Sequence, residues 1–191
     1  MGLSELKKQI YFIHEVEKLK TVSRANKTLD GRCENSAEHS WHVALVAQVF
    51  EKYAPVGIDM YKVTKLLLIH DIVEIDVGDT WLYAEDQSHK RASEEKAATR
   101  IFSILPGEQG DEFRALWDEF ENRLSREAKF AAAIDGINPL INHLLTGSPD
   151  DGVIPVEKVL AKKSFIKSCA PALWPLVESL IEESVEAGLY V

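Results

Sequence analysis

The stretch Leu66–Glu74 reads Leu-Leu-Leu-Ile-His-Asp-Ile-Val-Glu, so a strongly apolar segment runs directly into an imidazole and two carboxylates. We predict a helix over about residues 59–75 that is apolar nearly all round from Leu66 to Ile69, and such a helix is central rather than peripheral. Burying His70 and Asp71 beside aliphatic residues is unfavourable by several kcal/mol unless each has a partner. A bound cation is one partner that satisfies both, so this stretch favours a fold built around a polar centre.

Nearly every other periodic stretch is also helical, because apolar residues recur at spacings of three and four. The first such stripe consists of Leu6, Ile10, Ile13, Val16 and Leu19. A second helix begins near Asn35-Ser36, where Asn35 and Glu38 resemble a capping box. Further helices are predicted at about residues 91–105, around Phe113–Leu124, after Ser125, from Pro155 and at about residues 172–187. Residues 76–90 carry no clear period and are predicted to form a loop.

No alternating strand of useful length competes with these helices, and no repeat or linker divides the chain. We therefore predict an all-α fold, a single-domain helical bundle over residues 1–191. The metal-site core is expected at about residues 36–145, with the C-terminal helices at 155–187 packed on it.

Charge and composition exclude several kinds of partner. The formal net charge of −9 disfavours a nucleic-acid polymer, which needs a basic surface. A small phosphorylated substrate stays compatible if a cation and local Arg or Lys residues neutralise it. No apolar stretch reaches the length of about 18 residues that a membrane span requires, and the first residues lack a secretory signal pattern. Cys33 and Cys169 are predicted to be reduced thiols of a cytoplasmic protein, with one disulfide as the alternative.

Two further residues on other predicted helices, His39 and Asp135, can join His70 and Asp71 around one ion. Two imidazoles and two carboxylates form a mixed nitrogen and oxygen set, which suits one divalent transition metal ion (Mn, Co, Fe, Ni or Zn). Four ligands leave open positions at which water becomes acidic enough to react near neutral pH. Glu74 could then move a proton to or from that water or the leaving group.

Each of these residues also has a simpler interpretation. His39 alone reads as a hydrogen-bonded helix histidine, and Asp135 as a partner for an Arg or Lys. Glu74 alone could be a surface carboxylate, and Asp79 after a glycine suits any turn. The other histidines, His14, His42, His89 and His143, are predicted not to be ligands, and Trp81 and Tyr83 either stack on a base or cover the site.

The order of the motifs resembles the HD-domain superfamily of metal-dependent phosphohydrolases, whose pattern is a His, a later His-Asp pair and a distant Asp. The resemblance is closest to the 5′-deoxynucleotidase-like branch and covers about residues 1–145. It rests on Glu38-His39-Ser40, on His70-Asp71-Ile72-Val73-Glu74 followed by Gly78-Asp79-Thr80, and on Asp135 in Ala-Ala-Ala-Ile-Asp-Gly-Ile. The His-Asp pair alone is weak evidence, whereas the three motifs in this order are specific.

The resemblance implies an HD-type helical domain, a homodimer and a set of site residues. It implies metal ligation by His39, His70, Asp71 and Asp135, a proton-transfer or water-positioning role for Glu74, and a catalytic or substrate-orienting role for Asp79. Arg24 matches the Arg that contacts the substrate phosphate in that branch, and Ala25 follows it where the branch often has a Trp. Arg32 is a candidate for a second phosphate-binding cation.

We therefore predict a cytoplasmic metal-dependent phosphohydrolase that cleaves a phosphomonoester, with a (deoxy)nucleoside 5′-monophosphate as the favoured substrate. One alternative is an HD hydrolase of another substrate, such as a nucleoside triphosphate, a signalling nucleotide or a non-nucleotide phosphate. Another is a non-catalytic metal-binding helical module, in which Glu74 would be dispensable.

Overall fold

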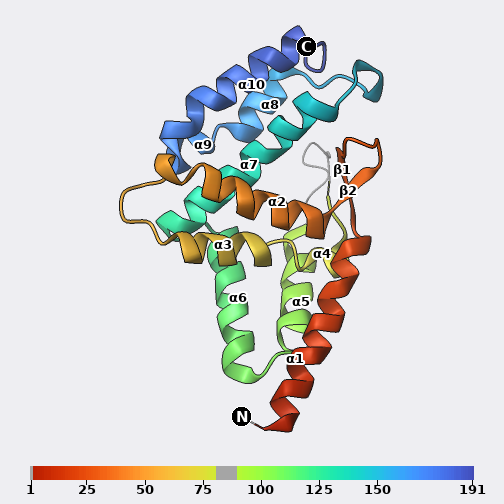
Figure 1. Cartoon of the computed structure of the whole chain (residues 1–191), viewed down its shortest axis with the longest axis vertical. Helices are drawn as coiled ribbons and strands as arrows, with labels where there is room; N and C mark the ends of the chain where they lie inside the picture. The colour runs from red at the N-terminus through yellow and green to blue at the C-terminus, as the bar shows by residue number, and fades with distance from the viewer. Residues whose placement is uncertain (1, 81–89) are drawn as a thin grey trace.

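The computed structural model describes residues 2–80 and 90–191, and nearly all of its regular structure is helical (Figure 1). The α-helices are α1 (Leu3–Val16), α2 (Ser36–Val49), α3 (Met60–Ile69), α4 (Glu74–Val77), α5 (Lys90–Phe102), α6 (Gly107–Glu121), α7 (Arg126–Thr146), α8 (Val156–Lys163), α9 (Ile166–Cys169) and α10 (Trp174–Glu186). The 3-10 helices are η1 (Glu17–Thr21), η2 (Glu51–Tyr53), η3 (Pro149–Asp151) and η4 (Pro171–Leu173). The strands are β1 (Ser23–Lys27) and β2 (Cys33–Asn35). The prediction of an all-α fold is confirmed.

Side-chain caps fix where the site helices begin. At α2, the Asn35 side chain accepts hydrogen bonds from the backbone N–H groups of Ala37 and Glu38, and the Glu38 carboxylate accepts one from the N–H of Asn35. This is the predicted capping box, and it satisfies otherwise unpaired N–H groups of the first turn. Ser125 caps α7 by accepting a hydrogen bond from the N–H of Ala128.

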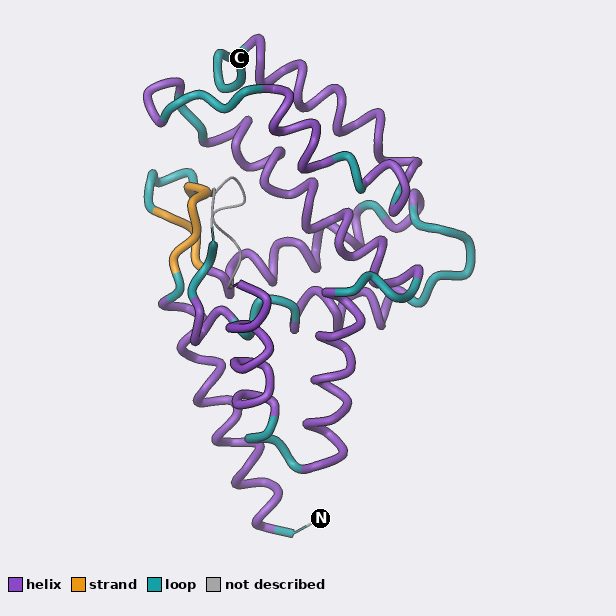
Figure 2. The backbone as a smooth tube through the Cα atoms, turned by 180° about the vertical axis from the view of Figure 1, so that it is seen from behind, coloured by secondary structure: helices purple, strands orange, loops and turns teal. Residues whose placement is uncertain are grey.

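The prediction that the chain contains no strand was wrong for residues 23–35. Strands β1 and β2 pair antiparallel in a two-stranded sheet, shown in orange in Figure 2. Their sequences, Ser-Arg-Ala-Asn-Lys and Cys-Glu-Asn, are too polar and short to alternate, so the hairpin depends on its turn rather than on an apolar face. In that turn the N–H of Gly31, at a φ of 84°, donates to the carbonyl of Thr28.

The helix predicted over 59–75 is interrupted after Ile69. In residues 70–73 the N–H of Ile72 donates to the carbonyl of Ile69, and the N–H of Glu74 donates to the carbonyl of Asp71. These bonds span three residues instead of four, which tightens the chain into turns. Apolar residues keep a helical spacing through residues 70–73, so the sequence pattern could not reveal that the helix is interrupted there.

The predicted apolar stripe of the first helix also behaves differently from expectation. Leu6, Ile10 and Ile13 are 52%, 50% and 61% exposed, and Phe12 is the buried residue of α1. Phe12 packs edge-on against Phe113 of α6, with 5.7 Å between ring centroids. Helix α1 therefore joins α5 and α6 at the N-terminal end of the molecule through a narrow contact (Figure 1).

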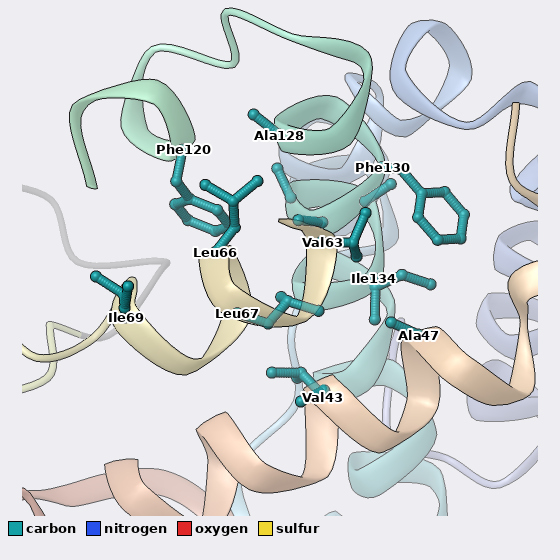
Figure 3. Close-up of a cluster of buried hydrophobic side chains, with 14 of the residues drawn as sticks. Val43, Ala47, Val63, Leu66, Leu67, Ile69, Phe120, Ala128, Phe130 and Ile134 are labelled. Carbon is teal, nitrogen blue, oxygen red and sulfur yellow. The ribbon is translucent and has the colours of Figure 1, made fainter. Parts of the chain in front are cut away.

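The core that positions the site is formed where α2, α3 and α7 cross. Figure 3 shows Val43 of α2, Leu66 and Leu67 of α3, and Phe130 and Ile134 of α7 around this crossing, with Leu66 beside Phe120, and the first five are fully buried. The C-terminal helices α9 and α10 pack on α7 at the other end of the molecule (Figure 1). No helix in the described ranges is both long and apolar enough to span a bilayer.

Candidate metal centre

Three predicted metal ligands converge on one point between the crossing helices. His39 lies on α2, His70 directly follows α3, and Asp135 lies on α7. One ligand atom from each lies within 4.8 Å of the others. His39 Nε2 is 2.9 Å, and His70 Nε2 3.6 Å, from Asp135 Oδ1. Residues separated by up to 96 positions in sequence are thus brought together by the α2–α3–α7 core.

The fourth predicted ligand, Asp71, adjoins this cluster. Its Oδ1 is 3.2 Å from His70 Nε2, and its Oδ2 is 3.8 Å from His39 Nε2. Two ligands at right angles around one ion, each at a bond length typical of transition metals, lie about 3 Å apart. The His39, His70 and Asp135 ligand atoms therefore have separations that suit a single transition metal ion, whereas Asp71 offers a different oxygen to each imidazole and its ligation stays a prediction.

The orientation of the two imidazoles is that of metal ligands. His70 Nδ1 donates to the carbonyl oxygen of Leu67 at 2.8 Å, which leaves Nε2 as the acceptor that faces the cluster. This Nε2 is buried and has no hydrogen-bond partner among the described residues. His39 Nδ1 lies 3.6 Å from the Glu34 carboxylate, and its Nε2 faces Asp135. Metal-bound imidazoles are usually held in this way by a carbonyl or carboxylate on the other nitrogen.

The charges of the cluster also call for a cation. Burial opposes protonation of His70, but the carboxylates of Asp71 and Asp135 outweigh it and raise its pKa to about 9. Burial and Arg24 likewise oppose protonation of His39, yet Asp135 and Glu34 raise its pKa. Burial would raise the pKa of Asp135, but the hydrogen bond from His39 and the proximity of His70 hold it well below its usual value. The carboxylates thus favour positive charge at this point, which a bound metal ion would supply.

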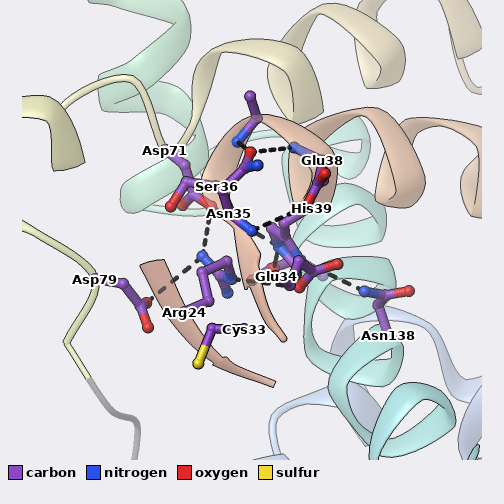
Figure 4. Close-up of polar contacts among 12 residues, drawn as sticks. Arg24, Cys33, Glu34, Asn35, Ser36, Glu38, His39, Asp71, Asp79 and Asn138 are labelled. Atoms are coloured by element: carbon purple, nitrogen blue, oxygen red, sulfur yellow. Dashed lines mark hydrogen bonds and ion pairs between the residues drawn. The ribbon is translucent and has the colours of Figure 1, made fainter. Parts of the chain in front are cut away.

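Arg24 of β1 lies among the carboxylates next to this cluster (Figure 4). Its Nη1 donates to Asp71 Oδ2 at 2.8 Å and lies 3.5 Å from both Glu74 Oε2 and Asp79 Oδ1. Its Nε is 3.8 Å from Glu34 Oε2. The hairpin therefore delivers a buried guanidinium to the point where the predicted ligands and the predicted catalytic carboxylates meet.

Glu74 is held in a protonation state that suits proton transfer. Ser36 Oγ donates to Glu74 Oε2 at 2.5 Å. Burial and the charge of Asp71 raise the pKa of Glu74 to about 8, although Arg24 and Ser36 act in the opposite direction. A carboxyl group whose pKa lies near the working pH can both release and accept a proton.

The structure does not bring Arg32 to the site. Its guanidinium forms two hydrogen bonds with Glu38, at 2.9 Å and 2.7 Å, and its side chain is 51% exposed. Glu38 is already the capping-box residue of α2, so Arg32 closes the outside of the hairpin onto that helix. The predictions for Trp81, Tyr83 and His89 fall outside the described residues.

The cluster lies on the wall of a cavity of about 620 Å³. One side is lined by Arg24, His70, Asp71, Glu74, Asp79 and Asp135. The other side comes from α7 and the C-terminal segment and includes His143, Lys163, Phe165 and Tyr190. The rings of His143 and Tyr190 are stacked, with 5.4 Å between centroids.

Two site residues were missed by the sequence reading. Glu34 is buried beside His39 and Arg24, and its only signal was its position directly before the cap of α2. Lys163 is buried in the cavity wall, although Lys162-Lys163 reads as a solvated charge pair. Its spacing from Val159 and Ile166, both fully buried, could have assigned it to the apolar face of its helix.

Comparison with known proteins gives consistent results. A sequence model of the HD domain family matches residues 16–174. A crystal structure from Magnetospirillum magnetotacticum MS-1, described as a predicted metal-dependent phosphohydrolase, is 37% identical in sequence, with a TM-score of 0.90 over 98% of this chain and 96% of that chain. The chain is also similar to 5′-deoxynucleotidase HDDC2 of Homo sapiens, at 30% identity over 66% of this chain and 62% of that protein. It is 29% identical to 5′-deoxynucleotidase YfbR of Shigella flexneri over 59% of this chain and 61% of that protein. These matches span less than two thirds of the length of either curated relative.

Proposed function

The chain belongs to the HD domain family, and from that premise we propose that it is a metal-dependent phosphohydrolase that cleaves a nucleoside 5′-monophosphate to nucleoside and phosphate. The observation that carries the proposal is the buried cluster of His39, His70 and Asp135, with Asp71 beside it, on the wall of a cavity that also contains Arg24 and Glu74. Similarity to proteins named metal-dependent phosphohydrolase and 5′-deoxynucleotidase supports it.

His39, His70, Asp71 and Asp135 would hold the metal. The unpaired Nε2 of His70 and the mixed imidazole and carboxylate donor set fit a divalent transition metal ion such as Mn, Co, Fe, Ni or Zn. When bound, such an ion supplies Lewis acidity toward water and the phosphoryl oxygens.

The other residues of this wall bind and orient the reactants. Arg24 presents its guanidinium to the cavity, and a phosphate oxygen can replace one of the carboxylates that now contact it. Glu74 Oε2 is the atom at which a proton is taken from water or returned to the leaving oxygen, with Ser36 fixing its position. Asp79 Oδ1 lies 3.5 Å from the same Arg24 Nη1 that contacts Asp71 and helps to orient the guanidinium toward the phosphate.

The cavity has the dimensions and lining that a nucleotide requires. A volume of about 620 Å³ lies within the range of small-molecule sites, roughly 300–1,000 Å³. His143, which is half-buried and stacked on the buried Tyr190, is our candidate for contact with a base. Ala25 also lines the cavity, with a side chain too small to pack closely against a sugar.

A substrate panel tests the proposal. Chelated protein is reloaded separately with Mn²⁺, Co²⁺, Ni²⁺ and Zn²⁺ and assayed for phosphate release from nucleoside 5′-monophosphates, nucleoside triphosphates and non-nucleotide phosphomonoesters. We expect metal-dependent release from the monophosphates. Fast turnover of another phosphoester with none of the monophosphates would support the alternative hydrolase, and release from no substrate with any metal would support a non-catalytic module.

We further propose that the protein acts as a cytoplasmic homodimer on small substrates rather than on nucleic acid or membranes. Both cysteines are unpaired thiols, and the net charge of −9 opposes binding to a polyanion. Trp41, Leu45 and Val49 form an apolar stripe on successive turns of α2 that is 63%, 47% and 66% exposed, which favours contact with a second copy. Sedimentation equilibrium tests this: Leu45→Glu should yield monomers, whereas a monomeric unmodified protein would refute the dimer.

A further inference from the structure

Lys163 is a buried cation of the cavity that the mechanism above does not use. It is the last residue of α8, it is only 2% exposed, and it lines the same cavity as Arg24 and Asp135. Within residues 2–80 and 90–191, its ammonium group has no hydrogen bond or ion pair, and its Nζ is not among the unpaired polar atoms that are closed off from solvent, so it faces the cavity. A buried ammonium without a partner is strongly unfavourable, so its presence here calls for a reason.

The other described cations that line the cavity are either paired with carboxylates or, like Arg123 and Lys162, exposed. Arg24 contacts several carboxylates, as described above. Lys27 is paired with Asp151, and Lys90 with Glu94. Lys162, the neighbour of Lys163, lines the cavity but is exposed. Among the described lysines of the lining, Lys163 is therefore the buried one without a carboxylate partner.

The charge balance of the cavity leaves a place for one more cation. Arg24 is already paired with four carboxylates, and the described carboxylates that line the cavity are Asp71, Glu74, Asp79, Glu94, Glu121, Asp135 and Asp151. A phosphate dianion added to this set would be uncompensated. Burial lowers the pKa of Lys163 to about 8, and Asp135 opposes and Arg24 reinforces this effect, so the lysine interacts electrostatically with both sides of the metal centre.

We propose that Lys163 Nζ binds the phosphate group of the substrate, as a second cationic contact supplied by α8 in addition to Arg24 from the hairpin. The proposal rests on the proposed function in taking a phosphomonoester as the ligand of this cavity. The ammonium group is buried and unpaired in the free protein because its partner is the phosphate of the bound molecule. The C-terminal part of the chain thereby contributes directly to recognition of the substrate.

Binding of inorganic phosphate to the metal-loaded protein tests this directly. We compare Lys163→Met, Lys163→Arg and the matched control Lys162→Met by titration calorimetry and by inhibition of turnover. We expect Lys163→Met to weaken phosphate binding about 10- to 100-fold, which is the usual effect of losing a hydrogen bond to a charged group. Lys163→Arg should retain part of the affinity, and Lys162→Met should bind phosphate within about twofold of the unmodified protein. Metal content should be unchanged in all three.

The outcomes separate this inference from the proposed function. Hydrolysis of a phosphomonoester together with unchanged phosphate affinity in Lys163→Met would overturn the inference alone. Loss of metal in Lys163→Met, or equal weakening by Lys162→Met, would overturn it by indicating a structural or general charge effect. Absence of hydrolysis in the unmodified protein, combined with phosphate binding that depends on Lys163, would refute the proposed function and support the inference. If Lys163→Met does not fold, Lys163→Arg provides the test, because arginine keeps the positive charge. A folded Lys163→Arg protein that no longer binds phosphate would contradict a charge contact at this position.

Discussion

The two walls of the cavity differ in the kind of side chain that lines them. The wall formed by the hairpin, α4 and the α2–α3–α7 crossing is crowded with carboxylates, and Arg24 is held there by four of them. The wall formed by the C-terminal segment is mainly apolar and aromatic, with Phe165 and Tyr190, and carries the buried ammonium of Lys163 without a partner. The first wall is thus arranged around positive charges, whereas the second offers a positive charge and an apolar surface to a ligand.

This difference indicates that the two walls have different roles in the reaction. Dense, mutually paired charges keep side chains in fixed positions, which metal binding and proton transfer require. An unpaired cation beside aromatic rings stabilises the protein less, but it is free to contact a ligand. The chemistry therefore belongs to the acidic wall, and recognition of phosphate and base is shared with the C-terminal wall.

The largest effect is expected from removing a metal ligand of the acidic wall. Asp135→Asn should reduce kcat/KM by about 10³-fold or more and abolish tight metal binding, because the ion contributes several kcal/mol to stabilising the charge of the transition state. The control is Asp151→Asn, which changes a carboxylate at the rim of the same cavity that is paired with Lys27. Metal analysis and steady-state kinetics measure both effects, and a fully active, metal-loaded Asp135→Asn protein would disprove the assignment.

A smaller but still large effect is expected at Glu74. Glu74→Gln should lower kcat by about 10²-fold or more with metal binding retained, as for loss of a general acid or base. Glu94→Gln, a change at another cavity carboxylate, should leave kcat within about twofold.

Glu74→Gln should also change how the free energy of unfolding depends on pH. The pKa of Glu74 is raised to about 8 in the folded chain, so between its unfolded value near 4.5 and pH 8 the unfolded chain binds fewer protons at this residue. Its contribution to stability is therefore lost progressively as the pH rises through this window. In chelated protein, urea unfolding should show Glu74→Gln becoming more stable relative to the unmodified protein from pH 5 to pH 8. A constant difference would mean that Glu74 is not buried as a neutral acid.

The next largest effect is expected at one of the two arginines predicted to bind phosphate, and the other arginine serves as its comparison. Arg24→Gln should raise KM for the phosphomonoester about 10- to 100-fold, because it removes a charged contact from the acidic wall. Arg32→Gln should leave kcat and KM within about twofold, since Arg32 is exposed and paired with Glu38 outside the cavity. Steady-state kinetics of the two variants measures this difference. Equal effects on KM would contradict the conclusion that Arg24 contacts the substrate and Arg32 does not.

The acidic wall could be predicted from sequence because its residues form short motifs with chemical requirements. A His-Asp pair at the end of an apolar helix needs partners, and the helical period assigned His39 and Asp135 to elements that could supply them. The interruption after Ile69 and the polar hairpin could not be predicted, because neither changes the apolar periodicity. Yet these two features aim Glu74 and Arg24 at the centre.

The C-terminal wall could not be predicted for a different physical reason. Its helices were expected from their periodicity, but recognition depends on which side chains the packing leaves facing the cavity, and no local motif encodes that. Lys163 illustrates this, because its spacing from Val159 and Ile166 can place it on the apolar face of its helix but cannot show that it lines the cavity. Conversely, the first three residues of the predicted N-terminal stripe, Leu6, Ile10 and Ile13, share a core-like period but are exposed, whereas Val16 and Leu19 of the same stripe contact the core.

The smallest predicted effect concerns the stability of the C-terminal wall itself. Lys163 has its pKa lowered to about 8 in the folded chain by burial, against 10.5 in the unfolded chain, so between these values the unfolded state binds more protons. Stability of the unmodified protein should therefore rise with pH across this window, whereas Lys163→Met, which has no titrating group there, should lack that rise. At pH 7, Lys163→Met should be more stable by about 1–2 kcal/mol, because burying a methionine avoids desolvating an ammonium. Urea unfolding of chelated protein at pH 7 and pH 10, with Lys162→Met as control, provides the measurement. A Lys163→Met protein that is less stable at pH 7 would mean that the lysine holds this wall together, and the contrast between the two walls would then be lost.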